Sequence, residues 1–277
     1  MKSLNKLQIT IILFSVLLFV LLYFANKTPE TKAEELATKG KPMNGKGMQD
    51  FVDAKTSTLP DSLKKVYTLV NATLQKDLKN PASLDSMISF WDRIMQPDVA
   101  AFYTEKKAEI AKTAEAWFKA GERYYYAVRF LKQPEQMEAV YQQAMFCFEK
   151  GLEKEPNNTA ARIKLASCYV DGTADPMKGI GMLRDIEKTD SNNVDLQLAF
   201  AAFSSKSGQL DKAVKRFEKV IQLKPDYLEA YLYLADAYEQ LGNKPKTIEN
   251  LQKYADLVPD KETKDEIKKY IDKLKSN

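Results

Sequence analysis

The sequence predicts an all-α protein made of stacked helix hairpins that follow an N-terminal transmembrane helix. The first observation is a break in the helical pattern that recurs at Pro156, Ser191, Pro225 and Pro259, in steps of 34 or 35 residues. A period near 34 in a helical chain is typical of stacked helix hairpins. The second observation is an uncharged apolar run at 7–25, which as a helix is about as long as a bilayer core is thick.

Residues 1–26 are predicted to form an uncleaved membrane anchor. Lys2 and Lys6 precede the apolar run, and no pair of small residues follows it as a signal-peptidase site would require. A cleaved signal peptide is the alternative. Basic residues are nearly balanced on the two sides, so the positive-inside rule leaves the orientation open. The short basic leader favours an inside N-terminus, with the repeats on the periplasmic side of a bacterial inner membrane.

Residues 27–58 are expected to be a flexible linker because they are polar, contain several glycines and prolines, and lack helical periodicity. Residues 40–47 match the Gly-x-x-x-x-Gly-Lys part of a phosphate-binding loop. However, Gly47 stands where Ser or Thr would hold magnesium, and no apolar strand precedes it. The sequence therefore predicts no nucleotide site there.

Residues 59–113 are predicted to contain a degenerate helical hairpin and the start of a long helix. The hairpin helices are expected at 59–78 and 82–96, where apolar residues recur on one helical face. From Asp98 to Leu131 the helical pattern continues without a glycine pair or a proline, and it stops before Pro134.

The segments from residue 114 onward have the residue types that hairpin packing needs. Ala201 and Ala213 are small enough to allow two helices to approach, and Phe217 supplies bulk beside them. Gly208 and Gly242 fall between paired helices, where a tight turn needs a positive φ angle. The prolines come just after the second helix, which they cannot continue.

This pattern resembles the tetratricopeptide repeat family. Four repeats are assigned, at 114–158, 159–193, 194–227 and 228–260, and a capping helix at 261–277. The last repeat matches the family through Tyr231, Leu234, Ala235, Tyr238, Leu251 and Pro259. The resemblance implies a right-handed superhelical array that acts as an interaction scaffold.

Composition excludes several classes of function. The chain has 42 basic and 38 acidic residues and a net charge of +4, without a basic stripe, so no nucleic-acid partner is expected. It contains no histidine, which removes the commonest general base and metal ligand. Cys147 and Cys168 are expected to be buried small side chains, with a disulfide or a metal site as alternatives. We therefore expect no enzyme activity, metal or cofactor.

The resemblance also implies a concave groove formed by the first helix of each repeat. The expected groove residues are Glu115, Phe118, Glu122, Tyr125, Tyr126, Ile163, Ser167, Leu198, Ala202, Leu232, Asp236 and Glu239. Three consecutive aromatic residues at 124–126 cannot all face one core, so Tyr125 and Tyr126 either line the groove or fill a larger core.

This expected wall is apolar and acidic, and it lacks the Lys, Asn and Arg with which family members bind carboxylate-terminal peptides. It suits a protein segment with apolar anchors and some basic residues. Two functions remain open. One is a membrane-anchored scaffold, and the other is an accessory or assembly factor that presents a client to a catalytic partner, similar to the anchored repeat proteins of cytochrome c maturation.

Overall fold

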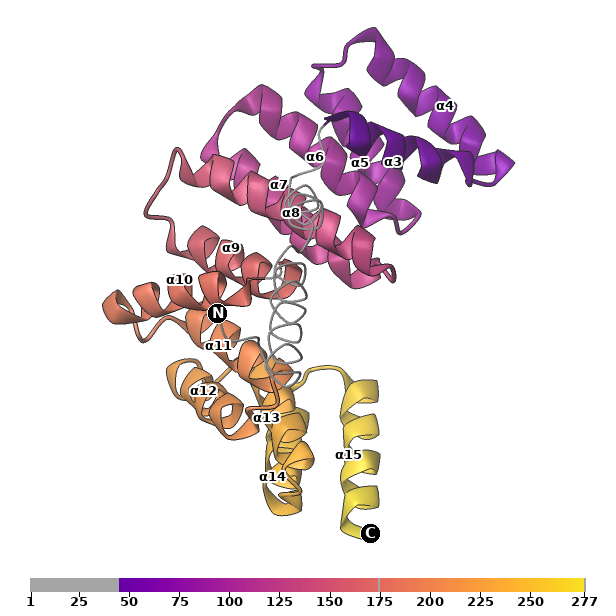
Figure 1. Ribbon diagram of the computed structural model, residues 1–277. Helices are drawn as coiled ribbons and strands as arrows, with labels where there is room; N and C mark the ends of the chain where they lie inside the picture. Colours follow the sequence, from indigo (N-terminus) through magenta and orange to yellow (C-terminus); the bar gives the residue numbers. More distant parts are fainter. Residues whose placement is uncertain (1–44, 174, 277) are drawn as a thin grey trace, which may run out of the picture. The chain divides into compact units, whose positions relative to one another are not determined.

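From α4 onward, each described helix packs against the next one along the chain. The computed structural model describes residues 45–173 and 175–276, which belong to one unit, Met43–Asn277. Within them there are thirteen α-helices and one 3-10 helix, and no strand (Figure 1). The all-α prediction is therefore confirmed for this part of the chain. The right-handed superhelix stays a prediction.

Each of the four predicted repeats contains one pair of helices. The pairs are α7 (Ala114–Ala127) with α8 (Pro134–Leu152), α9 (Thr159–Gly172) with α10 (Pro176–Thr189), α11 (Val194–Lys206) with α12 (Leu210–Leu223), and α13 (Leu228–Gln240) with α14 (Lys244–Leu257). The short helix η1 (Val128–Phe130) follows α7, and α15 (Lys261–Ser276) ends the array.

Local sequence signals set where these helices begin and turn. Side chains of Asn158, Asn193 and Asn243 accept hydrogen bonds from backbone N–H groups three residues later, which caps α9, α11 and α14. Gly208 and Gly242 have φ angles of +71° and +72° in the turns of the last two hairpins. The prediction of left-handed glycine turns at these two positions is confirmed.

The predicted hairpin at 59–78 and 82–96 corresponds to α4 (Asp61–Lys76) and α5 (Pro81–Arg93). However, α5 packs more extensively against α6 (Pro97–Ala111) than against α4. Helix α6 is buried on most of its circumference, from Asp98 to Glu105. The N-terminal part of the array is therefore centred on α6.

The prediction of one long helix from Asp98 to Leu131 is wrong. The chain breaks between α6 and α7 at Lys112, which has a left-handed φ of 55°, and the Thr113 side chain caps α7 by accepting from the Ala116 N–H. No glycine or proline marks this turn. The break lets α7 pack against α6, which a continuous helix could not do.

The prediction of a flexible linker is wrong for its last part, because α3 (Gly45–Ser57) lies within 27–58. Val52 is fully buried in the core. The Lys55 ammonium lies 3.3 Å from the buried Asp98 carboxylate and donates to Gln96 Oε1 at 2.7 Å. Tertiary contacts made by α3 thus outweigh its glycine-rich start, which favours a loop.

Small residues allow close approach within the hairpins. Ala213 is fully buried in the cluster that joins α11, α12 and α13. At Gly151 in α8, an added Cβ would lie 2.2 Å from Cε1 of Phe118 in α7, so only glycine leaves room for this ring. Close packing of this kind fixes the two helices of a hairpin relative to each other.

None of the helices in the described part of the chain is long and apolar enough to cross a membrane. The predicted anchor at 7–25 and the linker as far as residue 44 lie outside the described residues.

Candidate functional site

A cavity of about 450 Å³ lies along the first helices of the four repeats, and we call it the repeat pocket. Its wall combines residues of α7, α9, α11 and α13 with Arg129 of η1 and Phe217 of α12. The wall therefore depends on the stacking of all four hairpins. The predicted groove residues that line it are Tyr125, Ile163, Ser167, Leu198, Ala202 and Asp236.

Other predicted groove residues lie elsewhere. The Phe118 ring covers Gly151 of α8, so it belongs to hairpin packing. Tyr126 is 51% exposed and contacts the Phe130 ring outside the pocket lining. Glu115 and Glu122 are exposed and also lie outside the lining.

The two remaining predicted groove residues, Leu232 and Glu239, both interact with helix α15. Leu232 packs against the buried cluster that includes Ile271 of α15, and Glu239 accepts a hydrogen bond from the Tyr270 hydroxyl. Both side chains therefore interact with the terminal helix and lie outside the pocket lining. The repeat pattern of the sequence describes positions within one repeat, so it does not predict an interaction with α15.

Aromatic residues that the sequence reading missed form one end of the pocket. The rings of Phe217 and Tyr233 stack with centroids 5.5 Å apart, and Tyr227 also lines this end. Tyr233 is 51% exposed, so much of its ring is free to contact a ligand. The sequence does contain a signal for Tyr233, because this residue occupies the repeat position that holds Lys164 and Ala199, one residue after the predicted groove positions Ile163, Leu198 and Leu232.

The pocket wall carries both signs of charge, so the expectation of a wall without Lys or Arg is wrong. Arg129, Lys164 and Lys206 all line it. Lys206 pairs with Asp171 at 2.7 Å, whereas the Lys164 ammonium lies 5.4 Å from the centre of the Tyr125 ring. The expected lack of Lys and Arg was the reason to disfavour carboxylate-terminal ligands, and the pocket lining removes that reason.

Acidic side chains also line the pocket. Asp195 and Asp236 are exposed, and Asp236 accepts from Gln240 at 2.7 Å. Burial, with a smaller effect of Asp171, raises the pKa of Tyr125 to about 12. At neutral pH this phenol is uncharged and can both donate and accept a hydrogen bond.

The two cysteines lie in the core and are not bonded to each other. Burial raises the pKa of both Cys147 and Cys168, which keeps them as neutral thiols. Among the described residues, no group of three or more acidic or cysteine side chains is arranged to hold a metal ion. The pocket wall itself consists of aromatic, aliphatic, small polar and charged side chains.

Comparison with known proteins identifies the fold. A tetratricopeptide repeat protein from Parabacteroides merdae aligns with a TM-score of 0.52 over 83% of this chain and 85% of that chain, at 16% identity. MamA from Desulfovibrio magneticus aligns with a TM-score of 0.42 over 72% and 97% of the two chains, at 15% identity. YrrB, described as a tetratricopeptide repeat protein with an unusual peptide-binding site, aligns with a TM-score of 0.40 over 72% and 97%, at 20% identity.

The helices thus adopt the tetratricopeptide repeat fold. The family described as "Regulator of microtubule dynamics protein 1-3" matches residues 191–276, which is less than half of the chain. No curated protein matches the sequence.

Proposed function

We propose that this protein is a membrane-anchored scaffold that binds a segment of a partner protein in the repeat pocket. The observation that carries the proposal is the pocket itself, which combines the exposed Tyr233 ring with Leu198 and Ile163 along one continuous cavity. Exposed aromatic and aliphatic side chains in a concave site are the usual anchors for protein segments. The fold supports this role because stacked repeats present extended binding surfaces.

The charges of the pocket define the chemistry of the bound segment. Asp195 and Asp236 favour basic residues on the part of the segment that faces them, beside its apolar anchors. Arg129 and Lys164 favour a carboxylate near Tyr125. Such a segment is apolar with basic residues, as the sequence suggested, and also has an acidic group at one end.

Membrane attachment is the second part of the proposal, and it rests on the uncharged run at 7–25. A scaffold fixed to a bilayer raises the effective concentration of its partners at that surface. The repeats are proposed to lie on the periplasmic side of a bacterial inner membrane.

Site-specific photocrosslinking in native cells tests the binding role. A photoreactive residue at Ala202, which is exposed in the pocket wall, is expected to capture a discrete partner protein. The matched control is Gln222, which is exposed on α12 and does not line the pocket. Adducts of the same proteins from both positions, or no adduct from Ala202, would show that the pocket does not bind a partner.

A further inference from the structure

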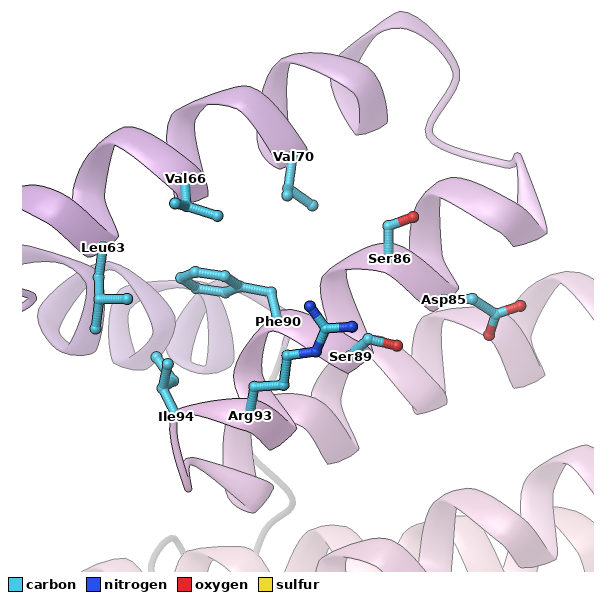
Figure 2. A pocket seen from close by; sticks show the side chains of 9 residues that line it. All are labelled: Leu63, Val66, Val70, Asp85, Ser86, Ser89, Phe90, Arg93 and Ile94. Carbon is cyan, nitrogen blue, oxygen red and sulfur yellow. The ribbon is translucent and has the colours of Figure 1, made fainter.

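A second groove lies at the N-terminal end of the array, between α4 and α5, and we call it the N-terminal groove. Its volume is about 570 Å³. Figure 2 shows Leu63, Val66 and Val70 of α4 facing Phe90 of α5 and Ile94 across the gap. These residues come from neither the repeats nor the repeat pocket, so the groove is a separate surface.

The groove is open because α4 is incompletely covered. Leu74 is its one buried residue, whereas Val66 is 46% exposed and Leu69 is 71% exposed. The groove residues of α4 are spaced three and four apart, and Phe90 and Ile94 are four apart. Two facing rows with helical spacing form the kind of channel into which the side chains of a third helix pack.

The charged residues of the N-terminal groove indicate what kind of helix would bind there. Among the described residues, no carboxylate forms an ion pair with Arg93, whereas Asp85 on the same helix is already paired with Lys107 at 2.7 Å. Figure 2 shows the guanidinium of Arg93 pointing into the gap. A free guanidinium beside an apolar channel favours an occupant with a carboxylate next to its apolar face.

Two apolar segments of this same chain fit the charge less well. Helix α4 of a second copy would bring Lys64, Lys65 and Lys76 with a single carboxylate, Asp61, toward Arg93. The apolar run at 7–25 has no charged residue and would leave Arg93 without a partner. Compared with these two segments, an acidic helix from another protein complements the Arg93 charge better.

We propose that the N-terminal groove binds an acidic amphipathic helix of a partner protein, with aliphatic anchors on Val66, Val70 and Phe90 and a Glu or Asp on Arg93. This site is distinct from the repeat pocket, and the scaffold can hold two partners at once.

The test uses the full-length chain, with detergent at the same concentration in every sample and in the blank. The probe is a labelled helical peptide of about 15 residues, roughly four turns, with Leu at positions i, i+3, i+4 and i+7 and mainly Glu elsewhere. A second probe has Lys in place of each Glu. Fluorescence anisotropy is expected to show tighter binding of the acidic probe.

Matched variants locate the binding. Val66→Glu places a charge in the groove and is expected to weaken acidic-probe binding about tenfold or more. Leu69→Glu adds the same charge on an exposed part of α4 outside the lining, and is expected to bind like the wild type. Arg93→Glu is expected to weaken binding about threefold, because exposed ion pairs are modest.

Equal binding of the two probes, or equal losses in Val66→Glu and Leu69→Glu, would overturn the proposal. So would no binding of the acidic probe, or a mass that rises to a dimer with concentration and returns to the monomer in Val66→Glu. Thermal melts that match the wild type are expected for all three variants, since each changes a partly exposed side chain.

Discussion

Glu105 places a carboxylate inside the core, in the middle of α6. The Tyr124 hydroxyl donates to its Oε2 at 2.6 Å, and Gln143 Nε2 donates to both oxygens at 2.9 Å. Burial raises the pKa of Glu105, and the hydrogen bonds from Tyr124 and Gln143 only partly offset this effect. A raised folded-state pKa means that the neutral form is favoured by folding, so this contribution to stability is present at low pH and is lost as the pH rises through the folded pKa.

Glu105→Gln is expected to remove this pH dependence. The variant keeps an acceptor for Tyr124 and adds an amide N–H that can serve the otherwise unpaired Gln143 Oε1. Urea midpoints measured from about pH 4 to about pH 8 should fall less with rising pH in the variant than in the wild type. Glu109→Gln is the control, because Glu109 is exposed on the same helix and pairs with Lys106. If the two variants have the same pH profile, burial of Glu105 does not carry the effect.

At the scale of elements, the turns of the hairpins depend on glycine where φ is positive. Gly208 has a φ of +71° between α11 and α12, with open space around the position of a Cβ, whereas Gly181 lies within α10 and also has open space around it. The two sites therefore differ in backbone conformation and not in room for a methyl group.

The same substitution should have opposite effects at these two glycines. Gly208→Ala is expected to destabilise the protein by about 1 kcal/mol because alanine is strained in the left-handed region. Gly181→Ala is expected to stabilise it by about 0.5–1 kcal/mol because alanine is the better helix former. Denaturation midpoints of the two variants measure both effects. Effects of the same sign would mean that the turn at Gly208 is not as described.

Local sequence patterns predict the four hairpins but not every helix and turn of the chain. The four hairpins were predictable because glycine, proline and asparagine mark their turns and caps in a regular period. The break at Lys112 and the helix α3 were not, since the first has no turn residue and the second is held by long-range contacts such as Lys55 with Asp98.

The candidate site was predictable to a similar extent. Six of the predicted groove residues line the repeat pocket, among them Ile163, Leu198 and Asp236. Arg129 is not predicted because it lies in η1, beyond the end of α7, and Leu232 packs against the cluster that includes Ile271 of α15 instead of lining the pocket. Both errors arise from contacts between elements that repeat periodicity does not encode.

In the whole molecule, the proposed anchor at 7–25 precedes a helical unit that buries its own core. Full-length protein is expected to stay with membranes through a carbonate wash, whereas a chain lacking residues 1–26 is expected to be soluble and folded, because the stacked helices bury their own core. Membrane fractionation with circular dichroism of the shortened chain measures both. Recovery of the full-length chain in the soluble fraction would contradict the anchor, and protease protection of a C-terminal tag would report the side of the membrane.

The repeat pocket is proposed to bind a partner through its exposed aromatic end, and one pair of variants can distinguish this end from other exposed aromatic residues. Tyr233 and Tyr126 are both 51% exposed, but only Tyr233 lines the pocket. The measurement is the affinity of each variant for the partner captured from Ala202, together with its thermal melt. Tyr233→Ala is expected to lower affinity by about thirtyfold, as for an aromatic anchor worth about 2 kcal/mol, while Tyr126→Ala binds like the wild type and both melt normally. Equal affinities of the two folded variants would contradict the account.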